Sequence, residues 1–130
     1  MGIDIVYLFG SYAQGKTHPL SDIDIGVVFK NPEKYKDKTM DAYLKLYDIL
    51  TDVLPKDYLK RRTKIREHEV DIVFLQFAPL NLQFNAIKDG VVLYERDEKV
   101  RFHYLEELMK RIADIQYFYN LRYKAILQRI

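Results

Sequence analysis

The chain has 130 residues, a net charge of +2, 48% hydrophobic residues and no cysteine. This length and composition support one hydrophobic core and therefore one domain. The nearly balanced charge gives no strong signal for nucleic-acid binding, and the lack of cysteine excludes disulfides, zinc-thiolate sites and cysteine nucleophiles. The apolar runs are too short to span a bilayer and no signal-like segment follows the N-terminus, so we expect a cytoplasmic protein without a membrane partner.

The stretch from Tyr7 to Phe29 reads as two apolar strands joined by a polar loop. The second strand opens with Asp22 and Asp24. Because side chains alternate between the two faces of a strand, these carboxylates project to the same side, about 7 Å apart along the backbone. Both can therefore reach one hard cation, and Mg²⁺ is the natural choice because it prefers oxygen ligands and shares its shell with substrate phosphates.

Gly10 and Ser11 stand at the break after the first strand. A glycine lets the backbone turn tightly and approach a ligand, and a short helix starting at Ser11 would direct free amide hydrogens at an anion. Ser21 precedes Asp22, where it either orients the carboxylates and nucleotide or forms an ordinary turn. A phosphate cradle facing two carboxylates predicts a combined nucleotide and metal site.

After Asn31 and Pro32 the spacing of apolar residues changes from that of a strand to that of a helix. Apolar residues recur at helical spacing up to Pro55, at Met40, Tyr43, Leu44, Tyr47, Leu50 and Leu54, which predicts a helix that packs on the core. Six basic residues follow, namely Lys56, Lys60, Arg61, Arg62, Lys64 and Arg66. Such a cluster binds triphosphate, RNA or an acidic partner in some proteins, but the low net charge favours a solvated surface here.

Residues 69–75 read as a buried strand with Asp71 in its interior. An ionised carboxylate inside a buried strand is costly unless it is paired or bound to a metal, so Asp71 is the candidate for a third metal ligand. The alternative is an exposed aspartate at a strand edge. A short helix over 79–88 and a last strand over 91–94 follow, and both are architectural.

Residues 97–130 predict one long helix, because they contain no glycine or proline and carry an apolar stripe at steps of three and four. The stripe consists of Leu105, Leu108, Ile112, Ile115, Tyr119, Ile126 and Ile130, and it is broken only around Arg122 and Tyr123. Further aromatic residues lie off the stripe. One small sheet cannot cover them all, so we expect a second apolar face to meet another chain, with packing across the protein's own sheet as the alternative.

The order Gly10-Ser11, ten residues, then Asp22-x-Asp24 resembles the signature of minimal nucleotidyltransferases of the DNA polymerase beta superfamily. The string FGSYAxG…SDIDIGV is similar to that of the MNT group, whose members are commonly the antitoxin halves of HEPN and MNT toxin-antitoxin pairs. The resemblance implies an α+β fold with a small mixed sheet flanked by helices. It also implies a catalytic core over 1–96, a partner-binding helical segment over 97–130, and a third acidic ligand on a neighbouring strand, for which Asp71 is the matching position.

The same resemblance implies a mechanism. Two Mg²⁺ ions held by Asp22, Asp24 and Asp71 align an acceptor hydroxyl with the α-phosphate of ATP, and pyrophosphate leaves toward Gly10 and Ser11. The implied acceptor is a tyrosine of a HEPN ribonuclease toxin, which receives AMP. The alternatives are a small-molecule nucleotidyltransferase and an antitoxin that neutralises its toxin by binding alone. Whether the chain forms a homo-oligomer, and which nucleotide it prefers, are left open.

Overall fold

The computed structural model describes residues 1–10, 23–53 and 70–129. In chain order its elements are β1 (Ile3–Phe9), β2 (Ile23–Phe29), the 3₁₀ turn η1 (Pro32–Tyr35), α1 (Thr39–Val53), β3 (Val70–Phe74), the 3₁₀ turn η2 (Leu75–Phe77), α3 (Leu80–Asp89), β4 (Val91–Glu95) and α4 (Glu98–Arg129). The predicted α+β class is confirmed.

The sheet is mixed, as predicted, and its strand order is β3-β2-β1-β4. Strand β1 pairs antiparallel with both β2 and β4, whereas β3 pairs parallel with β2. A parallel pair needs a crossover connection, and α1 lies in the segment that links β2 to β3. Strand β3 is consequently an edge strand with a neighbour on one side only.

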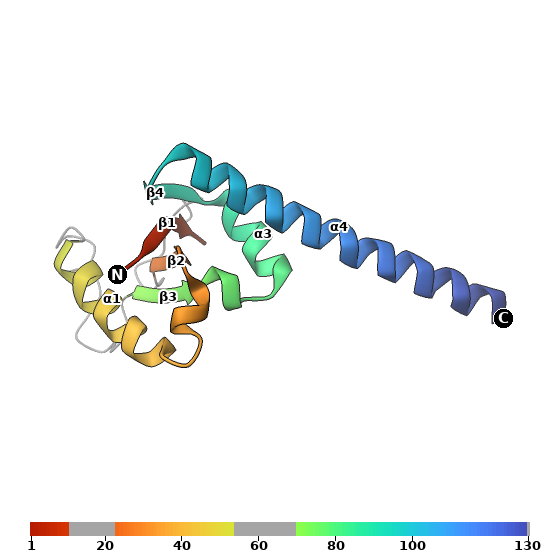
Figure 1. Ribbon diagram of the computed structural model, residues 1–130, viewed down its shortest axis with the longest axis horizontal. Coiled ribbons are helices and arrows are strands. Elements are labelled where there is room, and N and C mark those ends of the chain that lie inside the picture. Colours follow the sequence, from red (N-terminus) through yellow and green to blue (C-terminus); the bar gives the residue numbers. More distant parts are fainter. Residues whose placement is uncertain (11–22, 54–69, 130) are drawn as a thin grey trace.

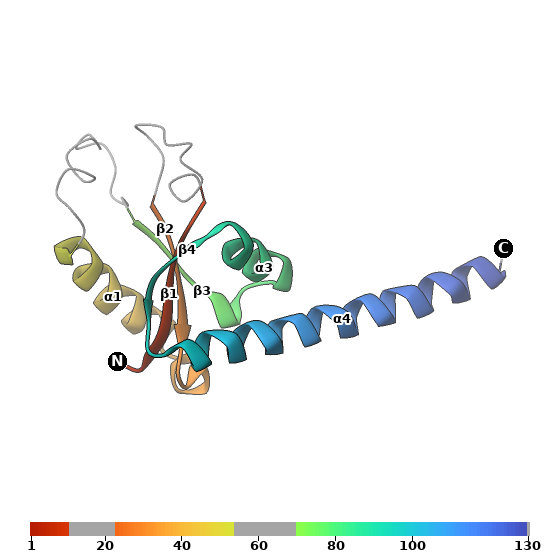
Figure 2. The same ribbon diagram turned by 90° about the horizontal axis from the view of Figure 1, so that it is seen from above.

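Helix α1 covers one face of the sheet, and α3 and the start of α4 cover the other (Figures 1 and 2). Strand β2 is buried on both faces. Ile25 and Val27 pack toward Leu46 of α1, while Val28 packs with Ile5 of β1 and Ala86 of α3. Two apolar faces explain why β2 reads as a nearly continuous hydrophobic run. An aspartate at its second position is therefore the exception in that strand.

Two element boundaries differ from the predictions for a physical reason. The helix expected from about residue 36 begins at Thr39, because Pro32 instead opens the separate 3₁₀ turn η1. Leu75 leaves the strand for η2 and remains fully buried, because its side chain fills the space above Gly26. A Cβ on Gly26 would lie 2.9 Å from Leu75 Cδ1, so only a glycine admits η2 this close.

Helix α4 runs past the edge of the domain (Figures 1 and 2). Its 32 residues correspond to about 48 Å of helix. Leu108 is its buried residue, and Val100 and Tyr104 pack against the core formed by β1 and α3. No helix in the part of the chain that the structure describes is long and apolar enough to cross a membrane.

Candidate active site

Strand register brings Gly10, Asp24 and Asp71 together at one end of the sheet. Phe9, which precedes Gly10, is the partner of Asp24 across β1 and β2, and Asp24 is the partner of Asp71 across β2 and β3. Residues paired directly on neighbouring strands lie about 5 Å apart and project to the same face. The carboxylates of Asp24 and Asp71 therefore share a face.

That face is the one covered by α3. Side chains alternate along β2, so Asp24, Gly26 and Val28 point to one side, and Val28 packs against Ala86 of α3. Asp24 lies at the strand end beyond this packed core and is only partly buried. The sheet thus holds both carboxylates at the same end, with Asp24 partly buried and Asp71 exposed.

Gly10 has a left-handed backbone conformation, with φ of 74°. A Cβ at this position would also collide with Oδ2 of Asp24. Glycine is therefore required here for two reasons, its backbone conformation and the close approach of a carboxylate. The missing side chain leaves room for the Asp24 carboxylate against the backbone of Gly10.

The prediction that β3 buries Asp71 is wrong. Asp71 is exposed, whereas its neighbours Val70 and Ile72 are buried against the α1 side. Because β3 is an edge strand, the start of its α3 face is open to solvent. Desolvation therefore gives no argument for Asp71 as a metal ligand, and its position in register with Asp24 provides the argument instead.

Tyr43, for which the helical spacing predicts only core packing, lies on α1, on the face of the sheet opposite the side chains of Asp24 and Asp71. Burial raises the pKa of Tyr43, the negative charge of Asp71 raises it further, and a hydrogen bond with the Ile72 backbone lowers it. This tyrosine thus lies close enough to Asp71 to sense its charge. Nothing in the helical spacing of Tyr43 distinguishes it from Tyr47, so the sequence carried no signal for this contact.

Three predicted site residues, Ser11, Ser21 and Asp22, lie outside the described residues, as does the basic cluster over 56–66. Within 1–10, 23–53 and 70–129 no three acidic, histidine or cysteine residues group into a metal site. The described part supplies two carboxylates, Asp24 and Asp71. Two carboxylates beside a glycine backbone suit Mg²⁺, which is commonly bound by one or two carboxylates together with substrate phosphates.

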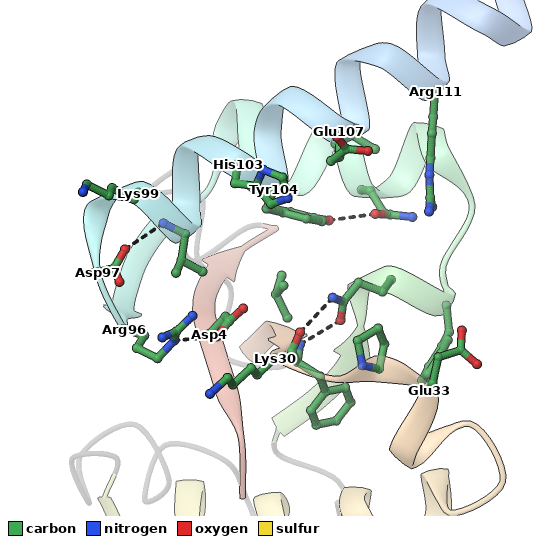
Figure 3. Close-up of a pocket in the computed structure, with 18 of the residues that line it drawn as sticks. Asp4, Lys30, Glu33, Arg96, Asp97, Lys99, His103, Tyr104, Glu107 and Arg111 are labelled. Atoms are coloured by element: carbon green, nitrogen blue, oxygen red, sulfur yellow. Dashed lines mark hydrogen bonds and ion pairs between the residues drawn. The ribbon is translucent and has the colours of Figure 1, made fainter.

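The opposite end of the sheet holds a cavity of about 810 Å³ between α4, η1 and η2 (Figure 3). Several of its polar groups are paired. The side chain of Gln76 bonds both the N–H and the carbonyl of Phe29, at 2.7 and 2.9 Å, and Arg96 forms an ion pair with Asp4 at 2.9 Å. These contacts join distant segments and indicate a structural role.

Tyr104 of α4 lines the same cavity. Its hydroxyl donates to Oε1 of Gln83 at 2.7 Å, and Nε2 of Gln83 donates to the carbonyl of Ala78 at 2.8 Å (Figure 3). Gln83 is only 2% exposed, so both bonds satisfy a buried amide. Burial raises the pKa of Tyr104 well above its usual value, and the nearby charge of Arg111 lowers it in part.

A family model described as polymerase beta, nucleotidyltransferase, matches residues 1–99. The chain belongs to the polymerase beta nucleotidyltransferase family. The matched segment contains Gly10, Asp24 and Asp71 and ends within the first turn of α4. Most of α4 therefore lies beyond the part that the family model describes.

Solved structures support the same assignment. The fold is similar to a crystal structure of a toxin-antitoxin with AMP-PNP, with 26% identity, a TM-score of 0.52, and coverage of 91% of this chain and 87% of that chain. It is also similar to a mutant of the toxin-antitoxin MntA-HpeT, with 25% identity, a TM-score of 0.51, and coverage of 89% and 86%. A search of curated proteins finds no match. The resemblance to minimal nucleotidyltransferases of toxin-antitoxin pairs is thus confirmed.

Proposed function

We propose that this protein transfers AMP from ATP to a hydroxyl group of a cognate toxin and acts in this way as its antitoxin. The observation that carries the proposal is the register of Asp24 with Asp71 beside the backbone of Gly10. Two carboxylates of like charge on adjacent strands repel each other, which disfavours the fold, but together they suit a cation. The similarity to a toxin-antitoxin crystallised with AMP-PNP supports a nucleotide at this site.

Asp24 and Asp71, with Asp22 from the adjoining segment, are the residues that would hold Mg²⁺. When bound there, Mg²⁺ neutralises charge on the triphosphate and stabilises the attacking and departing oxygens. The oxygen–phosphorus bond to the acceptor forms at the α-phosphate, while the bond from that phosphorus to the oxygen bridging the β-phosphate breaks. Pyrophosphate leaves with the electron pair of the broken bond.

The chain's own residues contribute positioning and proton transfer. Gly10 admits the Asp24 carboxylate against its backbone and so helps to position this metal ligand. Ser11 and Ser21 are proposed to contact the nucleotide. Asp71 is the more exposed carboxylate, so we assign it the acceptor side, where it takes the proton of the attacking hydroxyl. An acceptor on another protein can reach an exposed edge strand more easily than a buried one.

The acceptor is proposed to be a tyrosine of a HEPN-type toxin. Both structures reported above are toxin-antitoxin complexes, which supports a toxin as partner. A phenol is also a chemically suitable acceptor, because its usual pKa of about 10 makes it easier to deprotonate than an aliphatic hydroxyl. Neutralisation of the toxin by binding alone is the second candidate function. The exposed residues 113–129 of α4 favour it, because they are available to a partner.

The two functions separate in a transfer assay with α-labelled ATP, Mg²⁺ and the purified toxin encoded beside this gene. We expect labelled toxin with the wild-type chain, and at least about 100-fold slower transfer with Asp24→Asn or Asp71→Asn, because each change removes a charged ligand from the site. Asp37→Asn is the matched control, since Asp37 is an exposed carboxylate outside the site.

Transfer that survives both substitutions, or no transfer by the wild-type chain, would contradict the enzymatic proposal. Full neutralisation of the toxin by the Asp24→Asn chain, with a stable complex, would support binding alone.

A further inference from the structure

The two halves of α4 have different surroundings. In the first half, Val100, Tyr104 and Leu108 pack against the domain. From residue 113 to residue 129 every residue is exposed, and this part of the helix extends away from the sheet (Figure 2). Seventeen residues correspond to about 25 Å of helix, which is long enough to seat another protein.

The face of α4 that packs on the domain continues along the exposed half. Residues seven apart lie on the same side of a helix, so buried Leu108 is followed by Ile115 and Arg122, and Ile112 is followed by Tyr119 and Ile126. Ile115 is 42% exposed, Tyr119 66% and Ile126 50%. The domain therefore ends before its own apolar stripe does, and such a contiguous exposed patch is typical of an interaction site.

The charge of this half indicates what covers it. Residues 113–129 include Arg122, Lys124 and Arg129 and one acidic residue, Asp114, which gives a net charge of +2. Asp114 lies roughly a third of a turn around the helix from buried Leu108. Arg122 lies within the apolar stripe, and no carboxylate among the described residues forms an ion pair with it. A positive charge at the centre of an interface requires a carboxylate on the other side.

These charges disfavour a second copy of the chain as the occupant. Two exposed halves of α4, each with a net charge of +2, would repel each other, while the acidic residues Glu106 and Glu107 lie on the packed half, beside Lys110. Nucleic acid would meet the charges and stack on the aromatic rings, but it would leave aliphatic Ile115 and Ile126 uncovered. An acidic protein surface with an apolar groove satisfies both features.

We infer that the exposed half of α4, residues 113–129, docks an acidic, apolar groove of the toxin, with a toxin carboxylate opposite Arg122. The identity of this partner rests on the proposed function. The docking face continues the side of α4 that packs beside α3 (Figure 2). Strand register places Asp24 and Asp71 on that same face of the sheet. A toxin held on α4 is thus on the correct side of the sheet to present its hydroxyl to the carboxylates.

A binding experiment with matched variants tests this inference. The full chain carrying Asp24→Asn, which removes modification from the readout, is titrated against the purified toxin by calorimetry. We expect Arg122→Glu to weaken binding at least about 30-fold, because it opposes two carboxylates at the centre of the interface. Lys124→Glu makes the same charge change roughly 200° around the helix and should alter affinity less than about 3-fold.

A second pair of variants tests the apolar part. Tyr119→Ala should weaken binding about 10-fold or more, whereas Tyr117→Ala, which removes an equally exposed ring from the other side, should have little effect. Circular dichroism should show unchanged helix content for all four variants. Equal effects within either pair, or affinities unchanged by both Arg122→Glu and Tyr119→Ala, would overturn the docking surface.

Two further measurements exclude the other occupants. In sedimentation experiments on the chain alone, we expect no self-association that depends on Arg122. We also expect no Arg122-dependent binding of a 20-nucleotide single-stranded RNA. The variant Arg122→Glu is the control in both measurements. Either kind of Arg122-dependent association would overturn the proposal in favour of a second copy or of RNA. Absence of AMP transfer by the wild-type chain, together with selective loss of toxin binding in Arg122→Glu, would refute the proposed enzyme and leave the docking surface intact.

Discussion

The two ends of the sheet use charged and polar groups in opposite ways. At one end Asp24 and Asp71 place like charges in register on neighbouring strands. At the other end Arg96 meets Asp4, and Gln76 satisfies both backbone groups of Phe29. Like charges in register weaken a sheet, whereas paired groups hold segments together. The first end is therefore suited to a ligand, and the second end maintains the fold.

Gly10→Ala tests the ligand end most severely. It introduces a side chain at a φ of 74° and against Asp24 Oδ2, so we expect a loss of about 2–4 kcal/mol in the free energy of unfolding and a loss of transfer activity. Chemical denaturation measures the first and the transfer assay the second.

Gly2→Ala is the matched control, because a Cβ there would meet Lys30 Cβ at an ordinary 3.5 Å. If the two glycine variants were equally stable and equally active, the close contact between Gly10 and Asp24 would have no functional meaning.

Tyr104→Phe tests the structural end with a smaller effect. Removing the hydroxyl leaves Oε1 of buried Gln83 without its 2.7 Å bond, so we expect a loss of about 1–2 kcal/mol in unfolding free energy at pH 7 and unchanged transfer. If Tyr104→Phe lost AMP transfer without losing stability, the cavity end of the sheet would have a catalytic role and not only a structural one.

The pH dependence of this variant follows from the raised pKa of Tyr104. The folded state favours the neutral phenol, so its contribution is complete below the unfolded pKa of about 10 and is lost as the pH rises beyond it. The wild-type chain should therefore lose stability above about pH 10 more steeply than Tyr104→Phe. Burial also raises the pKa of Tyr7, so the variant should keep part of this sensitivity. Denaturation between pH 8 and pH 11 measures both slopes.

The sequence predicted the elements and the pairing of acidic residues better than their environments. The apolar runs at β2 and around Asp71 located the strands, and the motif identified the family, which is confirmed. For Asp71 the preferred interpretation, a buried carboxylate, is wrong, and the alternative of an exposed aspartate at a strand edge is correct. The sequence could not decide between them because strand order depends on tertiary pairing and has no local pattern.

The prediction of helix α4 was limited in the same way, because its environment depends on tertiary packing. Its apolar spacing predicted one stripe, broken only around Arg122 and Tyr123. The point near Ile112 where the helix leaves the domain is set instead by the length of the sheet and the position of α3. The roles of Ser11, Ser21 and Asp22 remain predictions, because these residues lie outside the described part of the chain.

The most direct test of the central claim is the position of a metal ion relative to Asp24 and Asp71. Crystals of the chain with Mn²⁺ in place of Mg²⁺ and a non-hydrolysable ATP analogue would locate the ion by anomalous scattering. We predict an ion within about 2.2 Å of a carboxylate oxygen of Asp24 and of Asp71, with the triphosphate beside Gly10. Nucleotide bound elsewhere, or an ion that contacts neither carboxylate, would contradict the account.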